Sequence, residues 1–591
     1  MTERRNKLSV LIARSRRLSL LCAVAVAIWL SGCSTIEKPV SSPYFAEVVT
    51  PPAKKEFRWS NGKLPKSFDP ALAAVPPETD VVRAIYEGLT ATDPRTLDAV
   101  PAVAEKWTVS EDGKTWQFQI RKDAVWSNGE PVKASDFVYA WNRLYQLEGK
   151  AAHPELLKNF AKIKQPVAKP SSTPWASDEP PPLIQKPTPS PQTESSAKAS
   201  EELVLDVKAE GDNALVVKLE TPDADLPKLL ANPMFSPIFG DGSEFASADV
   251  QKAIVSNGAF RLSSVSKDAV VLDKSDTFRN KSAVSVDTVR IIPVDSPDEA
   301  LEAYRSGRVD AVTNAEFEPL ALKILSPYQD FRKVTHGALN LYEFNTAKAP
   351  FNDRHVREAL SIAIERERLT EGEMEGSTRP ALRLLPLGGR PVQEMVQDIV
   401  RAKDLLATAG FPDGEGFPTI RLVINRNDAQ QRIARAVARM WKQNLGIETE
   451  IVTSEIADID TVRRSGEYDL IRRGVVFASA DPQTNLSAIF EPHEVKPDAL
   501  VQPSAQVLPS PPPLLRTAEN ERANDVIRTP RFASESEALD QFAAIPLYFP
   551  SSYSLVKPYV QGFEPNGLDI YSLQDVRIDS EWQPKQSRGE S

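Results

Sequence analysis

The sequence predicts an α/β protein with more than one domain. The chain has 591 residues, which exceeds what one hydrophobic core usually organises. Between residues 419 and 452, an apolar-alternating stretch, a helical apolar stripe ended by Gly446 and a second apolar stretch follow one another. This pattern is typical of a βαβ unit, which implies a parallel strand pair and a right-handed crossover.

The first segment, 1–33, has the pattern of an export signal. Six basic residues precede an apolar run from Leu18 to Leu30, which is short for a membrane span and suits a signal-peptide core. The run ends in Leu-Ser-Gly-Cys33, which resembles the lipobox of bacterial lipoproteins and implies a lipidated Cys33. An ordinary secretory signal with an accidental cysteine is the alternative. Residues 34–53, rich in Ser, Pro and Val, predict a flexible tether.

Local patterns in the body predict a hairpin and two helices. In 109–120 an Asp-Gly turn precedes apolar residues at alternate positions, which predicts a hairpin. Ser135 is an N-cap candidate for the helix that follows. Asp353 is placed to cap an amphipathic helix that extends to Leu369.

Composition argues against several classes of function. A formal net charge of -10 and 41% hydrophobic residues are typical of a globular protein and indicate no nucleic-acid partner. Both cysteines, Cys22 and Cys33, lie in the leader, so the body has neither a disulfide framework nor a thiolate metal site. The four histidines have no paired metal-ligand spacing. We therefore expect no metal, no cofactor and no enzymatic activity.

A series of stretches along the body occurs in the order found in one known family. They are SFDPAL (67–72), YEGL (86–89), PAVAEKW (101–107), SEDGKTWQFQIRK (110–122), WSNGEPVKASDFVYAW (126–141), VKAEGDNALVVKLETP (207–222), NGAFRL (257–262), ALEAYRSGRVDAV (300–312), YEFNTAKAPFNDRHVREALSIAIERERL (342–369), IARAVARMWKQNLGIETEI (433–451) and IPLYFPSSYSLVKPYVQGF (545–563). They resemble the bacterial extracellular solute-binding proteins of family 5, which are oligopeptide- and dipeptide-binding lipoproteins of ABC importers. No single motif is strong, but their shared order covers nearly the whole mature chain.

The resemblance implies a periplasmic-binding-protein-like type II fold, with two lobes (three subdomains) joined by hinge strands around a ligand cleft. The expected segments are 54–90, 246–338 and 545–591 for lobe I, 91–245 for an additional subdomain of lobe I, and 339–544 for lobe II. The stretches 165–196 and 496–514 are rich in Pro and Ser without apolar periodicity, and we expect exposed loops there.

The expected ligand site is centred on DLIRRGVVFASADP, residues 469–482. In the family, the matching stretch gives a strand edge along which an extended peptide lies, and an aspartate that binds the peptide's ammonium group. Alignment on Gly474 and Asp481-Pro482 places Ala478 at that aspartate, so the ammonium anchor is missing. Removing one partner of a buried charge pair costs on the order of 3–5 kcal/mol, so a free amino terminus is expected to bind poorly unless another carboxylate substitutes.

Further residues complete the expected site. Arg472 matches an arginine that faces the ligand in some relatives, and a guanidinium suits a carboxylate; a strand-edge role is the alternative. Glu343 matches an acidic residue near the cleft, with an ion pair to a local arginine as the alternative. For the neighbouring Arg463 and Arg464 we expect a solvated loop. The full set of expected ligand-binding residues is Tyr342, Glu343, Asn345, Arg472, Gly474, Val475, Val476, Phe477, Ala478 and Asp481.

The function implied by the resemblance is that of a lipid-anchored substrate-binding protein. It would capture a peptide or peptide-like solute between its lobes, close by hinge motion and deliver the ligand to an ABC permease at the periplasmic or external face of a bacterial membrane. We expect a monomer. The alternative is a non-transport envelope lipoprotein, a sensor or scaffold, that keeps the fold but has lost the anchor for the peptide amino terminus.

Overall fold

A computed structural model describes residues 43–147, 150–166, 201–387, 391–490 and 532–584. The signal segment, Cys33 and nearly all of the two Pro-rich stretches lie outside the described residues. The chain divides into two units, Met1–Phe45 and Ala46–Ser591, and the second unit contains every helix and strand below. Within the described residues, no helix combines the length and apolarity that a membrane crossing requires.

The largest sheet has seven strands and mixed direction. Its strand β1 (Glu56–Ser60) pairs in parallel with β12 (Thr288–Ile291) and β13 (Ala311–Val312). Antiparallel strands extend both sides of this group: β10 (Phe260–Val265), β11 (Val270–Lys274), β14 (Phe331–Thr335) and β21 (Ser551–Val556).

A four-stranded antiparallel sheet contains the predicted hairpin. The hairpin strands are β4 (Ala104–Val109) and β5 (Thr115–Ile120), and β8 (Val207–Ala209) and β9 (Ala214–Lys218) complete the sheet. The helix predicted next is α3 (Ala134–Gln146), but its N-cap is Lys133 and not Ser135. The Asp136 carboxylate accepts a hydrogen bond from the Lys133 N–H (2.9 Å), which fixes the start of the helix earlier than predicted.

The third large sheet has six strands in the order β16-β20-β15-β19-β17-β18. It contains the predicted βαβ unit, in which β17 (Ile420–Asn425) and β18 (Thr449–Ser454) are parallel and joined by α11 (Asp428–Leu445). Gly446 ends α11 with a φ of +72°, the left-handed conformation that favours glycine. The remaining strands are β15 (Ala338–Phe344), β16 (Arg379–Pro380), β19 (Leu470–Val476) and β20 (Ala544–Phe549).

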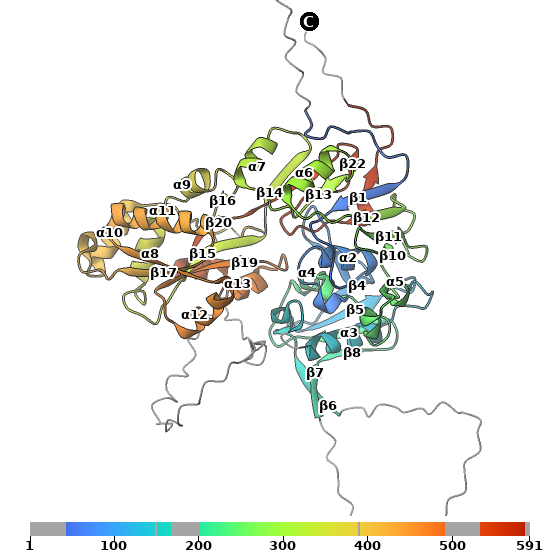
Figure 1. Cartoon of the computed structure of the whole chain (residues 1–591). Coiled ribbons are helices and arrows are strands. Elements are labelled where there is room, and N and C mark those ends of the chain that lie inside the picture. The colour runs from blue at the N-terminus through green and yellow to red at the C-terminus, as the bar shows by residue number, and fades with distance from the viewer. Residues whose placement is uncertain (1–42, 148–149, 167–200, 388–390, 491–531, 585–591) are drawn as a thin grey trace, which may run out of the picture. The chain divides into compact units, whose positions relative to one another are not determined.

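Helices cover both faces of the six-stranded sheet, with α11 on one side and α12 (Ile459–Ser465) and α13 (Pro482–Phe490) on the other (Figure 1). The predicted cap of α8 (Arg354–Ile362) is confirmed, because the Asp353 carboxylate accepts a hydrogen bond from the His355 N–H (2.8 Å). The helix ends at Ile362, short of the predicted Leu369. Beyond it the chain turns, and the buried Arg366 donates to the Pro546 carbonyl oxygen (2.7 Å).

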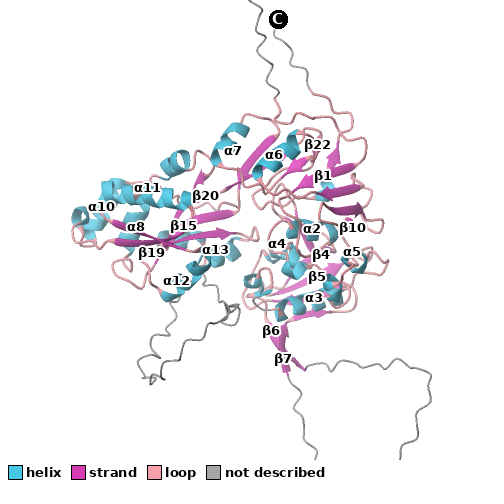
Figure 2. Cartoon of the chain, viewed as in Figure 1, coloured by secondary structure: helices cyan, strands magenta, loops and turns pink. Residues whose placement is uncertain are grey.

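The remaining described elements lie outside the three large sheets, and six of their strands form the two-stranded sheets β2-β3, β6-β7 and β22-β23 (Figure 2). They are α2 (Glu78–Ile85), β2 (Thr90–Thr92), β3 (Ala99–Pro101), β6 (Lys162–Pro166), β7 (Glu201–Leu205), α4 (Leu226–Leu230), α5 (Val250–Ala253), α6 (Pro297–Arg305), α7 (Pro319–Leu325), α9 (Arg366–Arg368), α10 (Ile399–Thr408), α14 (Glu535–Asp540), β22 (Val560–Gln561), β23 (Arg577–Ile578), the 3-10 turns Pro70–Leu72, Pro154–Leu157, Pro233–Phe235, Ser243–Ala246, Pro412–Gly414, Ile456–Asp458 and Leu573–Asp575, and the π-helical turn Leu369–Glu373.

The described part of the predicted tether is docked on the body. The Ala46 N–H donates to the Asp330 carboxylate (3.0 Å), and the Val48 N–H donates to the Arg305 carbonyl oxygen (3.1 Å). The Lys557 ammonium donates to the Val48 carbonyl oxygen (2.5 Å). The unit that contains the sheets begins at Ala46, so residues 46–53 of the predicted tether belong to that unit.

Two separate hydrophobic cores support the sheets. The first packs the seven-stranded and four-stranded sheets together, and the second lies around the six-stranded sheet. The chain passes from the first to the second between β14 and β15, at His336 and Gly337. It returns at Pro550, between β20 and β21, so β20 belongs to the six-stranded sheet although the expected boundary was at residue 545.

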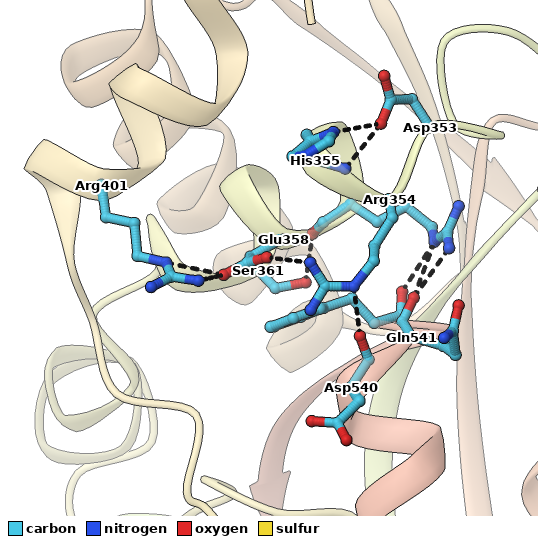
Figure 3. A network of polar contacts seen from close by, with 10 residues as sticks. Asp353, Arg354, His355, Glu358, Ser361, Arg401, Asp540 and Gln541 are labelled. Atoms are coloured by element: carbon cyan, nitrogen blue, oxygen red, sulfur yellow. Dashed lines mark hydrogen bonds and ion pairs between the residues drawn. The ribbon is translucent and has the colours of Figure 1, made fainter. Parts of the chain in front are cut away.

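A polar network fixes α8 to its neighbours in the second core (Figure 3). The buried Glu358 carboxylate lies between two guanidinium groups, accepting from Arg354 Nη1 (2.7 Å) and from Arg401 Nη2 (2.5 Å). Arg354 Nε also donates to the Asp540 carbonyl oxygen (2.6 Å), at the end of α14. The Glu358 carboxylate thus connects α8 to α10, and Arg354 connects α8 to the end of α14.

We expect Glu358→Ala to lower the free energy of unfolding by roughly 1.5–3 kcal/mol, because the variant removes the acceptor of two charge-assisted contacts while both arginines can rehydrate at the surface. Chemical denaturation followed by circular dichroism measures this change. Glu367→Ala, at an exposed glutamate on the short helix α9, is the matched control. Equal loss of stability in both variants would contradict the assigned role.

Candidate functional site

The stretch 469–482 forms β19, a short loop and the start of α13. Strand β19 pairs with β15 along its whole length, from Leu470 to Val476. With β17, on its other edge, it pairs only at Leu470 and Ile471. From Arg472 to Val476, that second edge has no paired strand among the described residues. A ligand with an extended backbone can add to such an edge.

Side chains of β19 alternate between the two faces of the sheet, which separates the predicted site residues into two groups. Val475 is buried on the face that carries α12 and α13, together with Arg473. Arg472, Gly474 and Val476 lie on the opposite face, where Val476 is 64% exposed. Only this second group can meet a ligand through its side chains.

Arg472 is the most distinctive residue on the face opposite α12 and α13. Its Nη1 donates to Asn425 Oδ1 (3.1 Å), and its Nη2 donates to Asn340 Oδ1. Its Nε is buried without a hydrogen-bond partner, and Arg472 forms no ion pair with a carboxylate among the described residues. Burial lowers the pKa of this guanidinium, with the two nearby tyrosines, Tyr548 and Tyr342, acting in the opposite direction.

Polar groups without partners surround this guanidinium. The Tyr342 hydroxyl is buried and unpaired, and burial raises its pKa, so the phenol stays protonated. Gln430 Nε2 donates to the Tyr548 hydroxyl (2.9 Å), but Gln430 Oε1 has no partner within the described chain. Gln430 lies in the first turn of α11, so the positive end of that helix dipole lies close to Arg472. The neighbourhood is suited to an anion.

Gly474 leaves space next to Arg472. A Cβ atom built on Gly474 would lie 2.9 Å from Arg472 Nη2, closer than such atoms normally approach. Any larger residue at position 474 would therefore displace the guanidinium from its present position.

Glu343 is engaged in a buried ion cluster on the other face. Its carboxylate accepts from Arg463 Nε (2.9 and 3.0 Å) and from Arg473 Nη1 (2.9 Å). Arg473 also donates to the Ala488 carbonyl oxygen (3.3 Å), near the end of α13. Glu343 thus has the alternative role considered for it, pairing with a local arginine. The expectation of a solvated Arg463 is wrong, because its side chain is 8% exposed, whereas Arg464 is exposed.

Asn345 shapes the turn that leads into β19. Its Nδ2 donates to the carbonyl oxygens of Gly466 (2.9 Å) and Tyr468 (3.0 Å), and the residue is buried. These contacts occupy both amide hydrogens, so the amide has no free donor for a ligand.

The loop 477–481 lies against residues of the first core. The Phe477 N–H donates to the Gly337 carbonyl oxygen (2.8 Å), and Ala478 packs against the first core. Asn232 Nδ2 donates to the Ala478 carbonyl oxygen (3.1 Å). The buried Asp481 carboxylate caps α13 by accepting from the Thr484 N–H (2.6 Å). Asp481 therefore already has a structural role.

Other carboxylates lie near Asp481. Burial, followed by the charge of Asp481, raises the pKa of Asp223 to about 6. Burial raises the pKa of Asp481 too, and Asp225 contributes to that shift. Asp225 itself forms an ion pair with Lys228 (3.2 Å). The carboxylates near Ala478 thus repel one another or are already bound by another group. Residue 478, as an alanine, supplies no carboxylate of its own.

Several residues of this site were missed from the sequence. They are Asn232, Asn340, Asn425, Gln430 and Tyr548. A general rule could have indicated Asn425, because it ends the first strand of the βαβ unit and ligands bind at the carboxyl ends of such strands. The others come from segments far from 469–482 and have no local signature.

Comparisons with known proteins agree with this architecture. The family model for bacterial extracellular solute-binding proteins, family 5 Middle, matches residues 98–496. The periplasmic oligopeptide-binding protein OppA of Escherichia coli strain K12 is 29% identical over 534 residues, covering 87% of this chain and 91% of OppA. The periplasmic murein peptide-binding protein MppA of the same strain is 28% identical over 551 residues, covering 90% and 95%.

A solved structure shows the same fold. The unliganded open form of the murein tripeptide-binding protein MppA matches with a TM-score of 0.66 at 23% identity, and the match covers 90% of this chain and 98% of that chain. The chain therefore belongs to the bacterial extracellular solute-binding proteins of family 5 and has their two-lobed, type II periplasmic-binding-protein-like α/β fold.

Proposed function

We propose that this chain is the substrate-binding protein of an ABC-type importer, anchored in the cell envelope through a lipid on Cys33, and that it binds a peptide or peptide-like solute along β19. Membership in a solute-binding family supports the general role. OppA and MppA are named as oligopeptide- and murein peptide-binding proteins, which supports the ligand class.

The observation that carries the proposal is the open edge of β19 beside an arginine with no carboxylate partner. The edge from Arg472 to Val476 offers backbone groups to an extended ligand. A guanidinium can bind a carboxylate through two parallel N–H groups, and in Arg472 the Nε N–H has no partner among the residues described, while Nη1 and Nη2 each already donate to an asparagine. We therefore place the ligand's main chain on β19 and its carboxylate at Arg472.

The amino end of the ligand meets a different environment. Residue 478 is alanine, and its carbonyl oxygen already accepts a hydrogen bond from Asn232. Asp481, the nearest carboxylate in sequence, caps α13. We expect a ligand held mainly through its backbone and its carboxylate, with less affinity derived from a free ammonium group than in relatives with an aspartate at the position of Ala478.

The route of closure follows from the two places where the chain passes between its cores. The first connection between the cores is His336–Gly337 and the second is Pro550, so each is only one or two residues long. Rotation there would bring the open edge of β19 towards the residues around Asn232 and enclose the ligand, and the closed form would then be offered to the permease.

The first test is mass spectrometry of small molecules released when the chain, purified from cells, is denatured. Recovered peptides support the proposal, and a different class of compound would replace the assigned ligand. An empty protein, across several growth media, would favour the alternative of an envelope sensor or scaffold that has kept only the fold.

We expect Arg472→Gln to weaken binding of a tripeptide with a free carboxylate by about 10- to 100-fold, because a charge-assisted pair is lost. The same variant is expected to bind the tripeptide amide with the affinity of the parent protein, because the amide has no carboxylate to pair with Arg472. Titration calorimetry measures both. Arg464→Gln, at an exposed arginine nearby, is the control, and a loss in it that matches Arg472→Gln would contradict the assignment.

For Ala478→Asp, we expect tighter binding of peptides with a free amino terminus and no gain for the same peptides after acetylation, because only the former carry an ammonium group. Ala480→Asp places a carboxylate two residues further along the same loop and serves as the control. An unchanged ratio of the two affinities in a folded Ala478→Asp protein would show that residue 478 does not face the ligand's amino end.

A further inference from the structure

A pocket separate from β19 lies in the part of the molecule that contains the first core. Its cavity measures about 90 Å³, which exceeds the space that a single water molecule needs. Its walls come from 83–92, 231–236, 259–260, Phe278 and 570–574. No residue of β15, β19 or the loop 477–481 lines it. The two sites meet only at Asn232, which lines the pocket and donates to the Ala478 carbonyl oxygen (3.1 Å).

Aromatic rings form much of the pocket wall. Phe260, Phe278, Tyr86 and Tyr571 line it from four separate segments. All four are buried residues of the first core, so their positions are fixed by packing and do not depend on any movement between the cores. Fixed ring faces and edges favour a flat apolar group.

Arg83 is the cation among the residues that line the pocket. Its side chain is 25% exposed, and the carboxylate of Asp80, which does not line the pocket, is 3.4 Å away. Burial lowers the pKa of Arg83 and raises that of Asp80 to about 7, so near neutral pH the Asp80 carboxyl is only about half ionised and balances the arginine incompletely. Glu87, the one acid among the residues that line the pocket, is bound by Arg279 (2.5 Å).

Two phenol groups in the wall have unused hydrogen-bonding capacity. The hydroxyls of Tyr86 and Tyr571 are buried and have no hydrogen-bond partner among the described residues. The hydroxyls of Ser552 and Ser554 and the carboxylates of Asp569 and Asp80 lie near the Tyr571 hydroxyl and affect its pKa. Burial raises the pKa of both phenols well above the usual value, so both remain donors. An oxygen-bearing anion would supply the acceptors.

We propose that this pocket is a second binding site, which takes a small organic anion with a flat apolar body and receives its anionic group at Arg83. The rings of Phe260, Phe278, Tyr86 and Tyr571 hold the body of the ligand. The site is distinct from the peptide site proposed on β19, because, apart from Asn232, which contacts both, the two use different residues.

Calorimetry on the full chain with benzoate tests this proposal, with benzamide as an uncharged probe of nearly the same shape. We expect benzoate to bind at least about tenfold more tightly than benzamide, and Arg83→Gln to remove that difference. Arg83→Lys keeps the charge and is expected to retain the preference. Ser572→Trp, which fills the pocket, is expected to abolish binding of both probes, and Arg261→Gln, at an exposed arginine outside the pocket, is expected to change neither.

The two proposals fail separately. Equal affinities for benzoate and benzamide, benzoate binding that survives Arg83→Gln, or no benzoate binding up to about 20 mM would overturn the second site. Benzoate binding that is lost in Arg472→Gln and kept in Arg83→Gln would also overturn it, by assigning the anion to the peptide site. The outcome with tripeptides bears only on β19. Circular dichroism of each variant confirms that it is folded.

Discussion

The arrangement of the whole molecule depends on the place where the chain passes twice between its cores. The His336 N–H donates to the Pro550 carbonyl oxygen (2.8 Å), which joins the outgoing passage to the returning one. The His336 ring also lies 3.1 Å from the Asp569 carboxylate. Strand β15 begins directly after this point and β20 ends directly before it. Since β19 pairs along its whole length with β15, the position of Arg472 follows from this hydrogen-bonded junction.

The buried charged residues of this protein differ in whether they have a partner of opposite charge, and this difference bears on function. Glu358 lies between two arginines, and Glu343 likewise accepts from two arginines. A buried charge without a partner is costly, so such pairing is what folding alone would select. Arg472 has only amide oxygens as partners, and the buried Arg357 and Arg366 likewise donate to carbonyl oxygens without a carboxylate partner in the described part of the chain. Arg472 differs from those two in lying on the strand whose edge has no paired strand beyond Ile471 among the described residues, and this combination is the basis for the ligand position proposed there.

The sequence was sufficient for features that depend on neighbouring residues. The hairpin at 109–120, the βαβ unit and the cap at Asp353 were all predicted, because each is encoded by periodicity or by a side chain within a few positions. The pairing of Glu343 with Arg463 joins residues 120 positions apart, and that of Asn232 with Ala478 joins residues 246 apart. No local pattern carries such information, so the division of the predicted site between two faces of a sheet could not be foreseen.

The late position of two strands in the chain has a consequence for how the protein folds. Strand β20 lies between β16 and β15, and β21 lies between β13 and β14. Both strands belong to the last 50 residues, because β20 begins at Ala544 of a 591-residue chain. Neither the six-stranded nor the seven-stranded sheet can acquire all its strands until this C-terminal segment is available. Its contacts, which join residues far apart in the sequence, must therefore form last.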